Sequence, residues 1–249
     1  MGNVKRATRR EKRLSGVIPR QRIHRFDFRR PSRKIIERYL KVEDLTSGIS
    51  DILDEKGIQG AIPASILRPI VSGRKVAGPA VTLRHLPERK TVVRKLFDKE
   101  RSRLAGVSDA REIAKPGDVL VFDGGGRMDV SSQGYLGALL MKEKGLAGTI
   151  LDCGVRDVEG IRRIGYPTWA RGITPITGNY RFEAYEINCP VVLAGIQIYP
   201  GDLVVADESG VVIVPSPLIE EVLLDLENAY KKEKEEEKSI LAGREKKTL

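Results

Sequence analysis

The segment 115–157 constrains the fold most, because it has the pattern of a complete β-loop-α-β unit. A KPGD turn leads into the apolar run Val119–Phe122, which predicts a short buried strand. A glycine-rich loop follows, then leucines at helical spacing that end at Gly145, and then a second apolar run, Thr149–Cys153. The expected apolar face of this helix contains Leu136, Leu139 and Leu140. A strand, a helix and a strand in this order are typical of an α/β fold.

The rest of the chain adds helices and strands to this unit. The expected elements are a helix over 33–57, a pair of strands over 66–71 and 75–83, a helix over 158–164, strands over 190–198 and 203–214, and a last helix from about Pro217. The apolar face of the last helix stops at Tyr230, so the charged run 231–238 either projects into solvent or lies across a partner. We expect one domain over 35–242, preceded by an arm over 1–34 and followed by a short tail over 243–249.

Composition excludes several classes of protein. With 41% hydrophobic and 31% charged residues, the chain is typical of a soluble globular protein. It has neither the run of about 18 apolar residues that a membrane helix needs nor the apolar core of a secretory signal, so we expect a cytoplasmic protein without a membrane partner. Cys153 and Cys189 lie in apolar stretches, which predicts reduced, buried thiols. His24 and His85 are the only histidines, which excludes zinc proteases, cytidine deaminases and His-rich metal sites.

The formal charge of +10 is concentrated in the arm. Residues 1–34 contain thirteen Lys and Arg residues and two acidic residues, which gives +11, whereas the remaining residues carry −1. We expect a mobile or partly ordered arm that attracts an anionic surface such as RNA, because each basic group that contacts a phosphate releases counterions. A solubilising tail, a strap on a neighbouring subunit and a mitochondrial transit peptide are the alternatives. The segment 86–103, with seven basic and three acidic residues, predicts a surface helix that is either a second basic patch or an ordinary solvated face.

Two loops, at 123–134 and 154–157, follow strands at the place where ligands collect in open α/β sheets. The first contains Asp123-Gly124-Gly125-Gly126, whose amides can hold a carboxylate or a phosphate, although for a triple glycine taken alone a tight turn is favoured. Its spacing fits neither a Walker loop nor a dinucleotide fingerprint. The second contains Arg156-Asp157, which combines a carboxylate clamp with a ligand for Mg²⁺. A helix-capping Asp beside a surface Arg is the alternative for this pair.

Five segments, in order, resemble one known family. They are GPAVTL (78–83), PGDVLVFDGGG (116–126), GLAGTILDCGVRDVEGIRRIGYPTWARG (145–172), INCPVVLAG (187–195) and PGDLVVADESGVVIVP (200–215). Over most of 45–242 the chain is similar to the family that contains the regulator of ribonuclease activity A (RraA) and the 4-hydroxy-4-methyl-2-oxoglutarate aldolases. The resemblance implies a three-layer β/β/α domain of the swivelling type, which assembles as a homotrimer or hexamer with sites between subunits.

The resemblance also implies roles for residues in the two loops. Arg156 corresponds to the arginine that holds the substrate carboxylate, and Asp157 to the direct ligand of a divalent cation, Mg²⁺ or Mn²⁺. The loop whose amides receive the substrate corresponds to Gly134, Tyr135, Leu136 and Gly137.

One position departs from the family pattern. Twenty residues lie between Tyr135 and Arg156, and at that spacing the family has an acidic residue that orients metal-bound water. A Tyr can donate a hydrogen bond or act as an acid, but it is a poor anionic base because its ordinary pKa is ~10. Asp129 and Glu159 are the candidates to replace the missing carboxylate.

Two functions therefore compete. The first is a divalent-metal-dependent lyase, an aldolase or decarboxylase, that acts on a short 2-oxo acid through a pyruvate enolate with Arg156 and Tyr135 as catalytic residues. The second is a non-catalytic RraA-like regulator that binds RNA or an RNA-processing enzyme. The Arg156-Asp157 pair favours the lyase, whereas Tyr135 and the basic arm favour the regulator. In an assembled ring, the last helix would bring Glu235 or Glu236 toward a neighbouring site.

Overall fold

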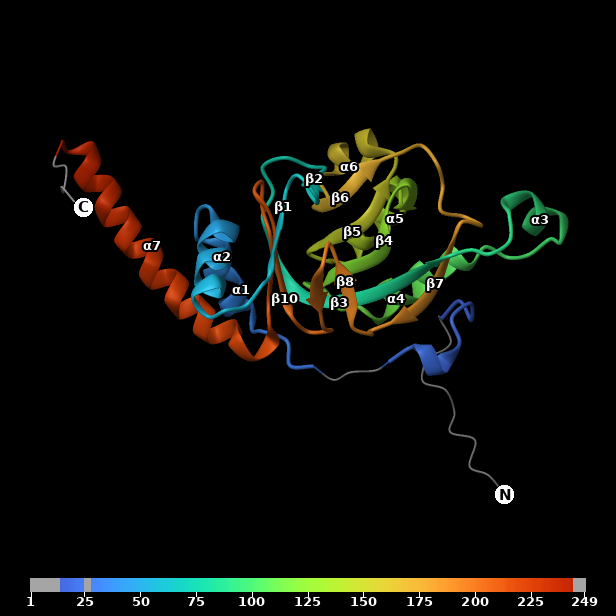
Figure 1. Cartoon of the computed structure of the whole chain (residues 1–249), viewed down its shortest axis with the longest axis horizontal. Coiled ribbons are helices and arrows are strands. Elements are labelled where there is room, and N and C mark those ends of the chain that lie inside the picture. The colour runs from blue at the N-terminus through green and yellow to red at the C-terminus, as the bar shows by residue number, and fades with distance from the viewer. Residues whose placement is uncertain (1–13, 25–27, 244–249) are drawn as a thin grey trace, which may run out of the picture.

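The computed structural model describes residues 14–24 and 28–243, which form an α/β fold (Figure 1). The strands are β1 (Ala61–Pro63), β2 (Arg68–Pro69), β3 (Val76–Pro87), β4 (Val119–Gln133), β5 (Gly148–Val155), β6 (Thr168–Ile173), β7 (Phe182–Ile187), β8 (Val191–Leu193), β9 (Ile196–Ile198), β10 (Leu203–Ala206) and β11 (Gly210–Val214). The α-helices are α1 (Arg33–Leu40), α2 (Leu45–Glu55), α3 (Val92–Phe97), α4 (Val107–Ile113), α5 (Tyr135–Glu143), α6 (Val158–Ile164) and α7 (Ile219–Leu241).

The main sheet has the strand order β1-β11-β10-β3-β4-β5-β6-β2, and β7 pairs with β3. The strands from β3 to β6 are parallel neighbours, whereas β1, β11 and β10 pair in antiparallel fashion. Strand β3 connects the two parts of the sheet, because Val76–Pro79 pairs with β10 and Ala80–Arg84 pairs with β4.

Alternating side chains bury both faces of this sheet. In β4, Leu120 and Phe122 contact the apolar cluster beneath α4, α5 and α6, whereas Val119 and Val121 contact a second cluster shared with β10 and β11. A third cluster lies between β10, β11 and the helices α1, α2 and α7. The expected three-layer β/β/α arrangement is confirmed. One β-layer contains β3 to β6 and is covered by α4, α5 and α6, and the second contains β1, β11 and β10. The helices α1, α2 and α7 add a helical layer over the outer face of the second β-layer (Figure 1).

Four expectations about individual elements are wrong. The short strand expected over 119–122 continues through most of the loop expected over 123–134, because β4 extends to Gln133. The helix expected over 33–57 is divided into α1 and α2, because Asp44 between them has a left-handed backbone with φ of 43°. The strands expected to pair over 66–71 and 75–83 lie apart, since β2 pairs with β6 at the end of the sheet.

The fourth error concerns the face of α5. Ala138 and Met141 face the core, whereas Leu136 and Leu140 are 70% and 50% exposed. The small Ala138 lets the helix approach the sheet, and the leucines beside it remain on the surface.

The described part of the arm lies against the domain. Ile18 is buried in the cluster beneath α4, and Ser15 donates hydrogen bonds to Asp109 from its amide (2.6 Å) and its hydroxyl (2.7 Å). Arg30 forms a two-pronged ion pair with the buried Asp118, at 2.8 and 2.9 Å. The mobility expected for the rest of the arm concerns residues 1–13 and 25–27, which lie outside the described residues.

Two further expectations concern thiols and membranes. Cys153 and Cys189 are buried free thiols, as expected. Among the described residues, no helix combines the length and the apolar character needed to cross a bilayer.

Candidate functional site

The loops that follow β4 and β5 lie side by side, because these strands are parallel neighbours. Gln133 and Val155 are paired at the ends of the two strands, and the Arg156 amide donates a hydrogen bond to the Gln133 carbonyl at 3.1 Å. Gly134 is the N-cap of α5, and Asp157 is the N-cap of α6. The first turns of both helices therefore meet at one place.

A pocket of about 570 Å³ opens between these two helix starts. Its lining comes from both loops and the first turns that follow them: Gly134, Tyr135, Leu136, Gly137, Arg156, Asp157, Val158, Glu159, Gly160 and Arg163. Every residue that the resemblance places in the substrate and metal site thus lies around one cavity of this chain.

The Asp157 carboxylate is held where the two loops touch. Its Oδ2 accepts a hydrogen bond from the Tyr135 amide at 3.1 Å and lies 3.4 Å from Arg156 Nε. A Cβ atom on Gly134 would lie 2.4 Å from Asp157 Oδ2, so the absence of a side chain there makes room for the carboxylate. Asp157 itself has a left-handed backbone with φ of 56°, which directs the chain into α6. The Arg156 and Asp157 side chains are 39% and 46% exposed, so a small ligand can reach both.

Tyr135 is positioned by residues that the sequence analysis did not identify. A Cβ atom on Gly160 would lie 2.8 Å from the Tyr135 ring, so that glycine lets the ring lie against α6. The guanidinium carbon of Arg163 lies 5.2 Å from the centre of the same ring, within the range of a cation–π contact. Gly160 and Arg163 follow Asp157 at intervals of three residues, which places all three near one face of a helix. This spacing is the sequence signal that would have identified Gly160 and Arg163.

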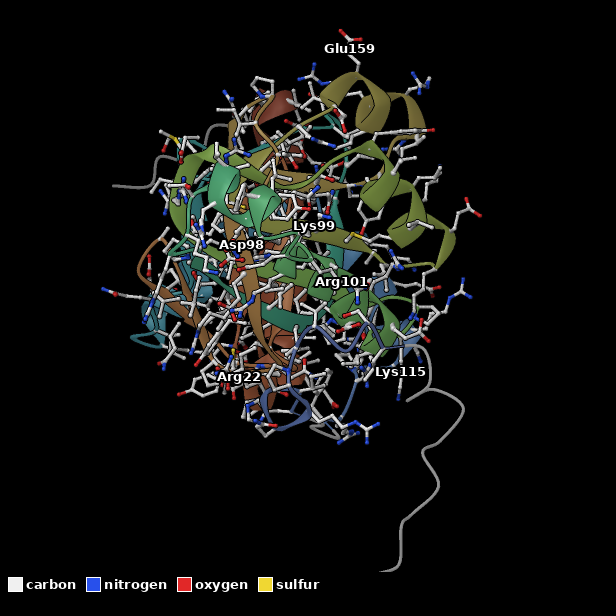
Figure 2. The ribbon with its side chains drawn as sticks, turned by 90° about the vertical axis from the view of Figure 1, so that its right-hand side faces the viewer. Arg22, Asp98, Lys99, Arg101, Lys115 and Glu159 are labelled. Atoms are coloured by element: carbon white, nitrogen blue, oxygen red, sulfur yellow. The ribbon has the colours of Figure 1, made fainter. Side chains whose placement is uncertain are left out.

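The other carboxylates considered from the sequence lie in different surroundings. Asp129 forms an exposed ion pair with Arg127 at 2.7 Å and does not line the pocket. Glu159 does line it, at the outer edge, and its side chain points away from the molecule at the top of Figure 2. Glu235 and Glu236 belong to α7, which lies in the helical layer on the other side of the β-layers from α5 and α6 (Figure 1).

The segment 123–126, expected as a glycine-rich loop, instead lies within β4, where the register with β5 is irregular, and it does not line the pocket. The Asp123 carboxylate accepts a hydrogen bond from the Gly125 amide at 3.1 Å, and the Gly126 amide donates to Asp152 at 3.1 Å. Asp152 also pairs with Arg171 Nε at 2.5 Å. Burial raises the pKa of the Asp152 carboxyl above its ordinary value, although the hydrogen bond from Arg171 opposes the shift. These contacts favour the structural interpretation of the triple glycine.

Comparison with known proteins gives consistent matches. The model of the RraA-like family, described as Aldolase/RraA, matches residues 46–213. A protein of Halalkalibacterium halodurans named putative 4-hydroxy-4-methyl-2-oxoglutarate aldolase is 30% identical over 193 residues, which are 77% of this chain and 81% of that protein. Protein DlpA of Legionella pneumophila is 31% identical over 175 residues, which are 70% of this chain but only 27% of DlpA.

A solved structure shows the same fold. RraAS2 of Streptomyces coelicolor, described as an unusual member of the RNase ES inhibitor RraA protein family, aligns with a TM-score of 0.67 and 29% sequence identity. The alignment covers 85% of this chain and 98% of RraAS2.

Proposed function

The chain belongs to the RraA-like (Aldolase/RraA) family, and from that membership we propose that it is a lyase that breaks a carbon–carbon bond in a short 2-oxo acid. The observation that carries the proposal is the convergence of Arg156, Asp157 and the first turn of α5 on one open pocket. The relatives named as 4-hydroxy-4-methyl-2-oxoglutarate aldolases support an aldolase-type reaction.

The pocket offers two kinds of donor to a 2-oxo acid. Arg156 contacts Asp157 through Nε, which leaves the terminal guanidinium nitrogens to bind a carboxylate in bidentate fashion. The first amides of a helix have no partner within the helix and carry a partial positive charge, so those of Leu136 and Gly137 can receive a second oxygen of the substrate. Together these groups would fix the plane of the carboxylate and the neighbouring keto group.

Asp157 is the residue that we propose as the ligand of Mg²⁺ or Mn²⁺. Within the part of the chain that the structure describes, no three His, Cys, Asp or Glu side chains form a cluster, so Asp157 would act with water and substrate oxygens. That donor set fits Mg²⁺, which keeps several waters and needs one or two carboxylates, better than it fits zinc. When bound, such a cation would polarise the keto oxygen and stabilise an enolate.

Tyr135 shapes the choice between two reactions. In aldol cleavage of a 4-hydroxy-2-oxo acid, a base takes the hydroxyl proton while the C3–C4 bond breaks, and pyruvate enolate and a carbonyl product form. In decarboxylation of an oxaloacetate-like acid, the bond to the carboxylate breaks, CO₂ leaves and no base is needed. A neutral phenol can protonate the enolate at C3 in both reactions but is a poor base for the first. We therefore expect slow aldol cleavage and comparatively faster decarboxylation.

The test is pyruvate release from several 4-hydroxy-2-oxo acids and from oxaloacetate, with and without Mg²⁺ or Mn²⁺. Asp157→Ala should lose both metal binding and turnover, because the other carboxylate of the lining, Glu159, points away from the molecule (Figure 2). Arg156→Lys should keep metal binding but raise KM, because an ammonium cannot make a planar two-point contact with a carboxylate. Asp129→Ala removes an exposed carboxylate outside the pocket and should change neither metal binding nor turnover.

A non-catalytic regulator remains the second candidate function, and Tyr135 is the observation that favours it. A chain that binds the RNA-processing machinery does not need the acidic residue that Tyr135 replaces. The similarity to a member of the RNase ES inhibitor family supports this candidate. Absence of metal-dependent turnover on the whole substrate panel, together with binding to an RNA-processing enzyme, would decide for the regulator.

A further inference from the structure

Two basic segments that are distant in the sequence border one cavity. The first is residues 14–24 of the arm, and the second is the loop and helix over 88–103, which projects from the end of β3 and carries α3 (Figure 1). Arg101 Nη1 donates a hydrogen bond to the Ser15 carbonyl at 3.1 Å and so links the two segments. Figure 2 faces this side of the molecule, with Arg22 below Arg101.

The cavity between them, which we name the basic groove, has a volume of about 920 Å³. Its cationic lining comes from both segments: Arg22, Arg89, Lys90, Lys95, Arg101 and Arg103. Three glutamates also line the basic groove, so the cations exceed the carboxylates by three. The groove is built on the arm, β3, α3 and β7, whereas the pocket described above is built on α5 and α6.

The glutamates are already engaged by some of these cations. Glu183 pairs with Arg103 at 2.8 Å and lies 3.8 Å from Arg22. Glu88 pairs at 2.6 Å with Lys95, and both side chains are almost completely buried. These pairs give the groove a fixed shape.

The remaining cations are open to a ligand. Lys90 is an exception, because it pairs with Glu100 and with Asp98, which lies outside the lining. Among the described residues, Arg89 has neither an ion pair nor a side-chain hydrogen bond and is exposed, and Arg101 contacts only the Ser15 carbonyl. The charges of Arg89 and Arg101 are therefore not neutralised by an ion pair within the described part of the chain and are accessible.

The chemistry of the lining indicates a phosphate polymer. Four of the six cations are arginines, whose planar guanidinium binds phosphate oxygens in pairs. The guanidinium of Arg22 lies 3.9 Å from the centre of the Tyr185 ring, and stacked Arg and aromatic groups are surfaces on which unpaired bases stack. Charged residues make up most of the lining, whereas the core of a protein–protein interface is typically depleted of charge. In the sequence, six more Lys and Arg residues directly precede residue 14, which suits a ligand longer than one nucleotide.

We propose that the basic groove binds the phosphate backbone of single-stranded RNA. The two segments act together, since neither has the full set of cations, and the site is independent of the lyase pocket. Arg89 and Arg101 contact phosphates directly. Glu183 competes with the RNA for Arg22 and Arg103.

The test measures binding of a fluorescent polyuridine of about 16 nucleotides to the full chain over a series of salt concentrations. The double variant Arg89→Gln/Arg101→Gln should weaken binding by about tenfold and reduce the slope of log K against log salt by about 1.4, because two phosphate contacts are lost. Glu183→Gln should instead tighten binding several-fold, since it releases Arg22 and Arg103. A damaged fold would not produce that gain.

The matched control is Lys231→Gln/Lys232→Gln, which removes the same charge from exposed positions of α7 at the far end of the molecule (Figure 1). It should leave both affinity and salt slope unchanged. Unaltered RNA binding by Arg89→Gln/Arg101→Gln, or equal weakening by the control, would overturn the proposal. Equal competition by polyglutamate of the same charge would show a site for acidic protein segments and would also overturn it.

Discussion

At the scale of single residues, the pocket depends on a glycine that leaves space for a carboxylate. Gly134 has φ of −132°, a backbone that alanine adopts easily, but a Cβ atom there would lie 2.4 Å from Asp157 Oδ2. Gly134→Ala should therefore displace the carboxylate and weaken metal binding by roughly tenfold or more, with little change in the free energy of unfolding. Calorimetric titration with Mn²⁺ and thermal unfolding measure the two effects separately.

Gly137 provides the control for this prediction. A Cβ atom at Gly137 would have its nearest neighbour at 3.7 Å, and the backbone amide would be kept. Gly137→Ala should reduce metal binding far less than Gly134→Ala and should stabilise α5 by up to about 1 kcal/mol, because alanine is the better helix former. Similar losses in both variants would mean that steric displacement of Asp157 is not the cause.

Tyr135 allows a test in which activity is gained. Tyr135→Asp restores the acidic residue at the family spacing and supplies an anion beside Asp157, so metal-dependent aldol cleavage should rise by roughly tenfold or more. Decarboxylation of oxaloacetate should change less, because it needs no base. Tyr135→Asn is the matched control, since it removes the phenol without adding a charge. If neither wild type nor Tyr135→Asp turns over any 2-oxo acid, the lyase proposal fails.

At the scale of elements, the arm is attached to the domain by a few specific contacts. One of these contacts is the Arg30–Asp118 ion pair, in which Asp118 is 1% exposed and accepts two hydrogen bonds from the Arg30 guanidinium. Arg30→Gln should destabilise the protein by about 2 kcal/mol, less than for a fully buried pair, because the Lys115 amide continues to donate to Asp118. Protease cleavage within residues 14–24 should accelerate in the same variant.

Arg33 is the matched control in the same part of the chain. Its ion pair with Glu37 lies on the surface of α1, with the arginine 92% exposed, so solvent screens it. Arg33→Gln should leave both the unfolding temperature and the cleavage rate nearly unchanged. Equal effects of the two variants would show that the Arg30–Asp118 pair does not hold the arm.

At the scale of the whole molecule, two large apolar side chains are exposed at the pocket. Leu136 and Leu140 are largely exposed on α5, next to an open cavity. We expect a second copy of the chain to cover them, in a trimer or a multiple of three. Light scattering should report that mass, and Leu140→Glu should shift it toward the monomer without loss of secondary structure. A wild-type monomer at micromolar concentration would contradict this expectation.

The sequence by itself determined the features that depend on local pattern. Apolar periodicity and glycine stops located the strand-helix-strand order of 115–157, although β4 extends through the expected loop to Gln133, and the helix over 158–164, which is observed as α6. Adjacency to a strand end located Arg156-Asp157, and the family resemblance added Gly134–Gly137. These residues meet because the carboxyl ends of neighbouring parallel strands lie at one edge of the sheet. The order of elements along the chain is therefore enough to predict that the two groups of residues form one site.

Only the tertiary structure decided which surfaces meet. The partners of β2 and β3, the exposed leucines of α5, and the contact of the arm with 88–103 all depend on residues far apart in the chain. Gly160 and Arg163 reach Tyr135 only because α6 packs beside α5. Local periodicity sets the type of each element, because a helix and a strand space their side chains differently. Strand pairing and helix packing depend instead on burial between residues far apart in the chain. Many arrangements of the same elements satisfy the local pattern, so the pattern alone does not select one.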